Sequence, residues 1–263
     1  TRIAFLGPPG TNSEEALLSD PELAAATHVS CSSIPEVVQR VEAGGADLGI
    51  VPFENAIEGA VTVALDTLAF ESDLLIRQEL VRPISFNLIA RPGTSLADVT
   101  TVVSFPYATA QCRDWLARTL PGATVEAATS TASAVERVAR SRSKGLGAIG
   151  ARLAADLHRL DVVAAGIEDH PDNATRFVLV GRGVPAPTGH DKTTVVVFQR
   201  EDRPGSLLGI LQEFAARSVN LTRLESRPAK TGLGRYCFAV DLEGHVADEL
   251  VADALRNVHA KHG

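Results

Sequence analysis

Short apolar runs alternate with amphipathic stretches through the first two thirds of the chain. Many of these runs end in Gly, Pro or small polar residues, and apolar positions at helical spacing follow several of them. This alternation is typical of an α/β protein and predicts a mainly parallel sheet. Strands are predicted at residues 3–6, 48–51, 84–90, 102–103, around 125, 147–150, 161–165 and 175–180. Helices are predicted from Thr11, where Glu14 would complete a capping box, at 59–70, around 115–116, at 132–139 and after 150.

The order of these elements predicts two similarly built α/β lobes in succession. After the second lobe, the chain is expected to return to the first and complete it. We assign lobe one to about residues 1–80 plus 166–182, and lobe two to about 81–165. Loops at the strand ends of such lobes face a cleft between them. Residues 183–192 are rich in Pro and Gly and lack periodicity, so we expect a linker there.

A different module is predicted after the linker, at residues 193–263. Strands are expected at 193–198, 220–227 and 235–242, and amphipathic helices at 206–216 and 247–259. This β-α-β-β-α order is a ferredoxin-like (α+β) layout that lacks its last strand. The sheet would then keep an open edge.

Composition and charge exclude several classes of protein. The 263 residues are 45% apolar, which allows an ordinary packed core, and their net charge is −7. Such an acidic chain lacks the basic surface that nucleic-acid binding needs, and none of its apolar runs is long enough to span a bilayer. Three scattered cysteines do not indicate disulfides, and the histidines lack the spacing of metal ligands. We therefore expect a cytoplasmic protein without a metal or another cofactor.

Small polar residues gather at the predicted strand ends. Gly10 and Thr11 could bind an anion through free N–H groups, or could form a plain capped turn. Glu54 and Asn55 could cap the next helix or could face the cleft. The other candidates at strand ends are Ser104, Thr129, Ser130 and Thr131.

A hydroxyl and a cation stand at the entrance of the last predicted strand of the lobes. Side chains alternate along a strand, so Thr175 and Phe177 should share a face while Arg176 points away. The three side chains could reach one ligand only if the strand were bent. The pattern fits a polar strand end as well as a catalytic group, and no nucleophile elbow is present.

Five stretches together resemble bacterial prephenate dehydratases that carry a carboxy-terminal ACT domain. They are residues 7–11, 51–59, 105–115, 173–177 and 204–228, so the resemblance covers nearly the whole chain. Its most specific feature is the sequence TRF at 175–177 followed by ESRP at 225–228. The resemblance implies a two-lobed catalytic domain of the periplasmic-binding-protein type, followed by an ACT domain.

The implied enzyme is a lyase of phenylalanine biosynthesis that converts prephenate to phenylpyruvate, carbon dioxide and water. In the family, the Thr of the Thr-Arg-Phe motif is tied to the departing hydroxyl, and this role carries over to Thr175, with Arg176 and Phe177 completing the motif. Because the substrate carries two carboxylates, we expect a locally positive cleft, with Arg176 and helix N-termini as contributors. The implied substrate-binding residues are Gly10, Thr11, Glu54, Asn55, Ser104, Gln111, Thr129, Ser130, Thr131 and Asn173.

The resemblance of the last module to an ACT domain implies that this module senses phenylalanine. Phenylalanine would then act as a feedback inhibitor of the enzyme. ACT domains commonly pair side by side, so a homodimer or homotetramer is implied. The implied effector-binding residues are Pro204, Gly205, Ser206, Leu207, Leu208, Asn220, Glu225, Ser226, Arg227 and Pro228.

Two departures from the family pattern fall in the implied substrate pocket. Ala56 stands where the family usually has Ser, and Asn12 stands where an aromatic residue usually follows Gly-Thr. Two other functions stay open beside prephenate dehydration. One is the same chemistry on arogenate, which has an amino group in place of the keto group. The other is a non-catalytic amino-acid sensor, because two lobes around a cleft also resemble solute-binding proteins.

Overall fold

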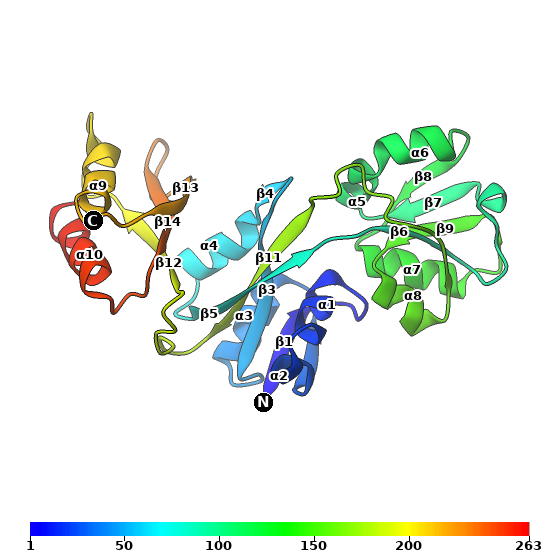
Figure 1. Cartoon of the computed structure of the whole chain (residues 1–263), viewed down its shortest axis with the longest axis horizontal. Helices are drawn as coiled ribbons and strands as arrows, with labels where there is room; N and C mark the ends of the chain where they lie inside the picture. The colour runs from blue at the N-terminus through cyan, green and yellow to red at the C-terminus, as the bar shows by residue number, and fades with distance from the viewer. Residues whose placement is uncertain (263) are drawn as a thin grey trace. The chain divides into compact units, whose positions relative to one another are not determined.

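The computed structural model describes residues 1–262, which form two compact units joined at Val184 and Pro185 (Figure 1). The first unit contains two β-sheets, each covered by helices. The second unit contains one sheet with two helices. Gly263, the last residue of the predicted second domain, lies outside the described residues.

The first sheet of the first unit has the strand order β2-β1-β3-β11-β5, with the short strand β4 beside β3. Its last partner in the chain, β11, comes from the end of the unit and pairs with β3 on one side and β5 on the other. The strands are β1 Arg2–Leu6, β2 Thr27–Cys31, β3 Leu48–Asn55, β4 Gly59–Ala60, β5 Leu75–Pro83 and β11 Ala174–Gly181. The helices are α1 Asn12–Leu18, α2 Pro21–Ala24, α3 Ile34–Glu42 and α4 Thr62–Phe70.

The second sheet has the order β10-β6-β9-β7-β8. Its strands are β6 Asn87–Ala90, β7 Thr101–Ser104, β8 Thr124–Ala127, β9 Leu146–Gly150 and β10 Asp161–Ala165. The helical segments are η1 Leu96–Asp98, α5 Pro106–Gln111, α6 Arg113–Thr119, α7 Thr131–Arg140 and α8 Arg152–His158. We call the first sheet and its helices lobe one, and the second sheet and its helices lobe two.

The expectation of a mainly parallel sheet is wrong, because both sheets are mixed. In lobe one, β11 is antiparallel to β3 and β5, and in lobe two, β6 is antiparallel to β9 and β10. The chain passes to lobe two after β5 and returns before β11. A chain that leaves and returns along neighbouring paths lays the two strands in opposite directions.

Three strands of lobe one were absent from the predicted set: β2, β5 and the two-residue strand β4, which occupies the start of the predicted helix 59–70, whereas α4 begins at Thr62. Strands β2 and β5 are both at the edges of their sheet and are mostly half-buried or exposed. A strand that buries little surface has no apolar run and no regular alternation, so the hydrophobic pattern does not reveal it.

The predicted capping box at the first helix is also wrong. The Thr11 hydroxyl donates to the Leu6 carbonyl at 2.9 Å and leaves the helix N–H groups alone. The Glu14 carboxylate accepts from the N–H of Gly10 at 2.6 Å, one residue before the expected partner. Thr11 therefore ties the start of α1 back to the end of β1.

A continuous buried apolar cluster joins the two lobes. It includes Phe5 and Phe177 of lobe one and Leu88, Leu116 and Ile149 of lobe two. Because these side chains pack as one core, the relative placement of the lobes within this unit is supported by burial as well as by the crossing strands.

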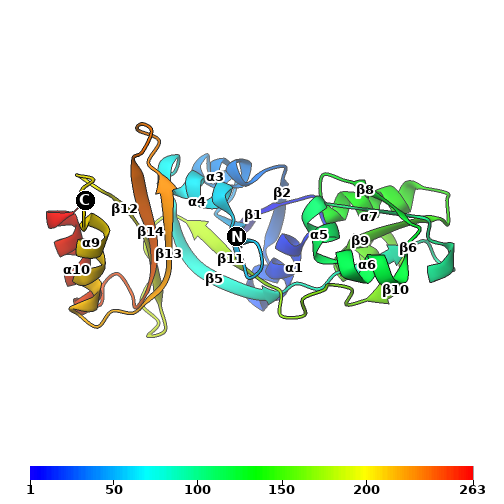
Figure 2. The same ribbon diagram turned by 90° about the horizontal axis from the view of Figure 1, so that it is seen from above.

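The second unit has a three-stranded antiparallel sheet in the order β12-β14-β13. Both of its helices lie on one face of that sheet (Figure 2). The elements are β12 Lys192–Phe198, α9 Ser206–Ala215, β13 Leu221–Pro228, β14 Tyr236–Glu243 and α10 Glu249–Lys261. Their core includes Ile210 and Phe214 of α9, Val240 of β14 and Val258 of α10.

Replacing Gly10 by Ala should destabilise the first unit more than the same change at Gly93. Both glycines have positive φ, +89° at Gly10 and +74° at Gly93, so both variants should lose about 1–2 kcal/mol through backbone strain. A Cβ at Gly10 would also lie 3.0 Å from the Cα and Cβ of Ala154 on α8, while one at Gly93 would meet no atom within 4 Å. Overpacking should add about 1–3 kcal/mol at Gly10 only.

Urea unfolding of the two variants measures this difference in the free energy of unfolding. Equal losses would show that lobe one and lobe two do not touch at Gly10.

Candidate functional site

The Thr175 hydroxyl is held by the side chain of Asn55. The two residues lie opposite each other on β11 and β3, and Asn55 Nδ2 donates to Thr175 Oγ1 at 2.9 Å. Thr175 is 8% exposed. Within residues 1–262 this is the hydroxyl's only hydrogen bond, and the hydroxyl is the acceptor in it. The Thr175 proton is therefore available to donate to another molecule.

Asn55 is itself fixed by the turn that follows β3. Its Oδ1 accepts from the N–H groups of Ile57 and Glu58, both at 3.0 Å. With the oxygen facing these two donors, the amide nitrogen must face β11. There it donates to Asn173 Oδ1 at 2.9 Å as well as to Thr175. The local turn thus determines which atom of Asn55 meets the Thr175 hydroxyl.

Two more side chains extend this arrangement into lobe two. The Asn173 amide donates to Gln111 Oε1 at 2.7 Å, and the Gln111 amide donates to Glu58 Oε1 at 3.2 Å. Gln111 is at the end of α5 in lobe two, whereas Glu58 follows β3 in lobe one. Asn173 is 1% exposed. We call Asn55, Glu58, Gln111, Asn173 and Thr175 the amide network.

Arg176 lies on the opposite face of β11 from Thr175. Its Nε is 2.6 Å from a carboxylate oxygen of Glu79, and its Nη1 is 3.6 Å from one of Glu54. Its guanidinium also lies 5.3 Å from the centre of the Phe53 ring. These contacts commit the charge of Arg176 to two carboxylates and an aromatic face.

A bulge in β3 accommodates these contacts. The pairing passes from Arg176 opposite Glu54 to Phe177 opposite Pro52, which leaves Phe53 without an opposite residue on β11. Phe177 is 1% exposed and belongs to the core that joins the lobes. The motif therefore separates into a hydroxyl in the amide network, a cation in an acidic cluster and a ring in the core.

The other predicted polar residues of the cleft are occupied by local contacts. Ser104 is fully buried, and its hydroxyl donates to the Ile149 carbonyl at 2.7 Å. Ser130 caps α7 by accepting from the Ser133 N–H, and Thr129 Oγ1 lies 3.1 Å from Ser133 Oγ. Thr131 is the first residue of α7. The structure thus brings Asn55, Gln111, Asn173 and Thr175 together, whereas Gly10, Thr11, Ser104, Thr129, Ser130 and Thr131 make their hydrogen bonds elsewhere or begin a helix.

Two titratable groups near the lobe contact have shifted pKa values. Burial raises the pKa of the Glu15 carboxyl, and the Leu153 N–H that it accepts at 3.2 Å opposes this shift. Burial also raises the pKa of the Cys112 thiol, and the negative charges of Asp169 and Glu168 raise it further. The Cys112 thiol is therefore protonated at neutral pH and is not a nucleophile.

Neither a metal site nor a membrane span is found in the part of the chain that the structure describes. No group of three or more His, Cys, Asp or Glu residues within 1–262 could hold a metal ion. None of the helices described there combines the length and apolar character needed to cross a bilayer.

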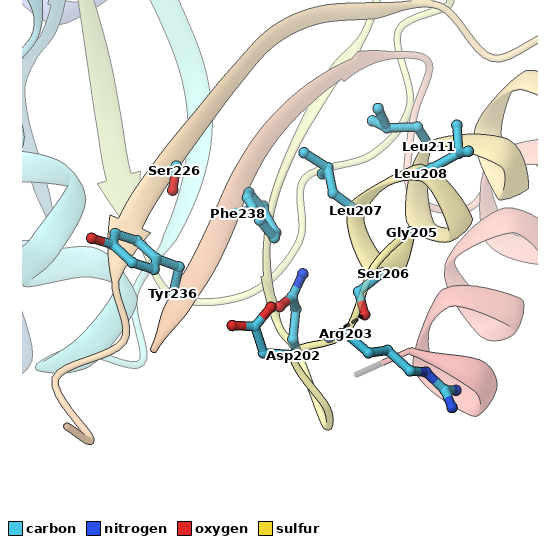
Figure 3. A pocket seen from close by; sticks show the side chains of 11 residues that line it. Asp202, Arg203, Gly205, Ser206, Leu207, Leu208, Leu211, Ser226, Tyr236 and Phe238 are labelled. Atoms are coloured by element: carbon cyan, nitrogen blue, oxygen red, sulfur yellow. Dashed lines mark hydrogen bonds between the residues drawn. The ribbon is translucent and has the colours of Figure 1, made fainter. Parts of the chain in front are cut away.

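The second unit contains a pocket of about 470 Å³ between the start of α9 and the sheet (Figure 3). Five of the predicted effector-binding residues are at this end of α9, and four of them, Gly205 to Leu208, line the pocket together with Ser226 of β13. The sequence did not indicate the other lining residues, which are Gln199, Asp202, Arg203, Leu211, Tyr236 and Phe238. The only available signal was the position of Asp202 and Arg203 directly before the Pro-Gly turn.

The remaining predicted effector residues do not line this pocket. Asn220 is exposed, and Pro228 ends β13. The Glu225 carboxylate lies 3.0 Å from Arg223 and 3.8 Å from Arg227, so it belongs to a charged cluster on the sheet. Within a single chain, the predicted effector set is thus divided between the pocket and the strand β13.

Comparison with known sequences identifies relatives of both units. The prephenate dehydratase family profile matches residues 3–184, and the ACT domain profile matches residues 194–260. A prephenate dehydratase of Mycolicibacterium vanbaalenii is 43% identical over 98% of this chain and 87% of its own length. One of Mycobacteroides abscessus is 43% identical over 99% of this chain and 86% of its own length.

Two solved structures share the fold over the whole chain. A prephenate dehydratase from Arthrobacter aurescens in complex with L-Phe has a TM-score of 0.93 and 44% identity, and 87% of its chain is covered. GqqA, a quorum-quenching acylase, has a TM-score of 0.86 and 29% identity, and 94% of its chain is covered. The predicted fold class, a two-lobed catalytic domain followed by a ferredoxin-like ACT domain, is confirmed.

Replacing Asn55 by Asp should destabilise the first unit by about 2 kcal/mol. The change keeps the oxygen that accepts from Ile57 and Glu58 but removes the donor to Thr175 and Asn173. The Thr175 hydroxyl can rotate and donate to the new carboxylate, but Asn173 Oδ1 and the Ala174 carbonyl lose their donor and face a carboxylate instead. Unmatched polar groups of this kind cost about 1–3 kcal/mol.

The matched control is Gln39→Glu, the same change of amide to acid at an exposed position of α3. It should alter the free energy of unfolding by less than about 0.5 kcal/mol. Urea unfolding at pH 7 compares the two, and an Asn55→Asp loss as small as the control's would contradict the amide network.

Proposed function

The chain belongs to the prephenate dehydratase family, and we propose that Thr175 is the group that assists the departing hydroxyl of prephenate. The reaction gives phenylpyruvate, carbon dioxide and water in phenylalanine biosynthesis. The electron pair of the bond to the lost carboxylate moves into the ring, which becomes aromatic as the C–O bond breaks. The leaving oxygen must receive a proton to depart as water. The protein has to place the substrate and help that oxygen leave.

The hydrogen bond from Asn55 to Thr175 is the observation that supports this role. Because Thr175 Oγ1 accepts from Asn55, its own O–H bond is directed elsewhere. An alcohol is a poor acid, so Thr175 acts as an oriented donor that passes a proton on, and not as a reservoir of protons. Assistance by a general acid contributes about 10²–10⁴-fold to rates. Orientation and charge stabilisation have to supply the rest.

We assign Asn55, Gln111 and Asn173 to positioning at the same site. Each is linked to Thr175 through side-chain amides, and Glu58 completes the network. We assign Arg176 to holding β11 against Glu79 and Glu54, and Phe177 to the core. With Arg176 paired in this way, the positive potential for the two carboxylates of the substrate has to come from backbone N–H groups and other cations.

The amine-bearing analogue arogenate is the open alternative as substrate. Acyl hydrolysis, the activity of the relative GqqA, is not proposed for this chain. It requires a nucleophile activated by a base. Among the residues that the structure describes, the Thr175 hydroxyl meets an amide, and burial keeps the Cys112 thiol protonated by raising its pKa.

We propose that residues 1–182 form the catalytic domain, that 183–192 form the linker and that 193–263 form a regulatory domain for phenylalanine. The profile matches at 3–184 and 194–260 and the L-Phe complex of the Arthrobacter aurescens relative support this division. The effector carboxylate would meet backbone N–H groups at the start of α9. We further propose that the protein is cytoplasmic and forms a homodimer or homotetramer. Light scattering of the purified protein would test the oligomeric state.

Replacing Thr175 by Val should lower kcat for prephenate by about 10²–10⁴-fold, because the isosteric side chain cannot donate to the leaving hydroxyl. Thr175→Ser keeps the hydroxyl and should retain most of the activity. The measurement is phenylpyruvate formation by the purified proteins, with arogenate assayed in parallel. Unchanged urea unfolding of both variants would show that the fold is intact.

A Thr175→Val enzyme as fast as the parent would remove Thr175 from the mechanism. Turnover of arogenate and not of prephenate would keep the mechanism and change the substrate. Binding of phenylalanine without turnover of either compound would instead support a sensor.

A further inference from the structure

We propose that the Asp202 carboxylate binds the ammonium group of the effector and so restricts regulation to amino acids. This inference rests on the proposed effector site and names the group that determines its specificity. Asp202 precedes the Pro-Gly turn and lines the pocket at the start of α9. It is the only acidic residue among the residues that line this pocket.

The carboxylate of Asp202 has no charged or hydrogen-bonding side-chain partner among the residues that the structure describes. The adjacent Glu201 behaves differently, since its carboxylate lies 3.3 Å from Arg203 Nη1. In Figure 3 the Asp202 carboxylate points toward the side of the pocket that holds Tyr236, whereas the Arg203 guanidinium points away. The pocket therefore has an uncompensated negative charge on one wall.

The start of α9, which also lines the pocket, carries donors for a carboxylate. The backbone N–H groups of Gly205, Leu207 and Leu208 have no acceptor in the described chain, whereas the N–H of Ser206 is bound by the Arg203 carbonyl at 3.0 Å and that of Gly209 by the Gly205 carbonyl. Gly205 has φ +87°, which lets the turn present these groups at the start of α9. The backbone N–H groups complement the carboxylate of a free amino acid, and Asp202 complements its ammonium group.

The rest of the pocket is apolar and fits an uncharged side chain. Leu207 and Leu211 approach from α9, and Phe238 and Tyr236 approach from β14 (Figure 3). Phe238 is 9% exposed and fixes the floor, while Tyr236 is 48% exposed at the rim. A ring could therefore lie between helix and sheet, with its α-carbon at the charged end.

This arrangement would allow the pocket to bind an amino acid more tightly than the corresponding keto acid. Phenylpyruvate, the product of the proposed reaction, has the same ring and carboxylate as phenylalanine but no ammonium group. In the pocket, its carboxylate would find the N–H donors but would also meet the repulsion of Asp202. The Asp202 carboxylate would thus prevent phenylpyruvate, the enzyme's own product, from acting as the effector.

The test is isothermal titration calorimetry of the full chain with L-phenylalanine and with 3-phenylpropanoate, which lacks only the ammonium group. Asp202→Asn should weaken phenylalanine binding roughly tenfold, the range of a charge-assisted hydrogen bond at a partly exposed site. The same variant should bind 3-phenylpropanoate as well as the parent does, or better, because the repulsion is gone. This opposite response of two ligands is not expected from a structural defect.

Glu249→Gln is the matched control, since it removes one negative charge from an exposed position of α10 outside the pocket. It should change neither affinity. If the parent binds phenylalanine and Asp202→Asn binds it equally well, the role of Asp202 is wrong while the effector site stands. Equal weakening of both ligands by Asp202→Asn would also overturn it. If the parent does not bind phenylalanine at all, the proposed effector site fails as well.

Discussion

The hydrogen bond from Asn55 to Thr175 is the contact on which the rest of the amide network depends. It exists because β11 returns from lobe two and pairs directly with β3, placing the two residues opposite each other. The turn after β3 holds the Asn55 oxygen, so the nitrogen has to face β11. A hydroxyl that accepts from a fixed amide has its donor direction set before any substrate arrives, and such preorganisation lowers the reorganisation cost of the reaction.

The same bond connects the Thr175 hydroxyl to the relative position of the lobes. Asn173 shares the Asn55 amide with Thr175 and passes the connection to Gln111 on α5. A shift of α5 against β3 would have to break the contact of Gln111 with Asn173 or with Glu58. Polar contacts of this kind depend more steeply on geometry than apolar packing does. The buried core therefore holds the lobes together, while the amide network specifies their register.

The sequence predicted the strand that carries Thr175, because a continuous apolar run identifies a strand buried on both faces. It also predicted the alternation that separates Thr175 from Arg176. It could not show that Arg176 is paired, because Glu79 lies on β5, an edge strand without an apolar pattern. The capping box failed for a related reason, since the motif specifies residue types whereas the Leu6 carbonyl competes for the Thr11 hydroxyl. The hydrogen-bond partner of such a side chain depends on tertiary contacts, which local sequence patterns do not contain.

The covalent path between the two units begins on the strand that holds the Thr175 hydroxyl. Thr175 is near the start of β11, and Gly181 ends that strand, after which the chain leaves the first unit. The exit is fixed, because Arg77 Nη1 donates to the carbonyls of Arg182 and Gly183 at 2.6 and 2.9 Å. A strand paired along both edges transmits displacement better than a loop does, since its ladder hydrogen bonds resist local bending. If the second unit regulates the first through the chain, β11 brings that effect to Thr175 through a single rigid element.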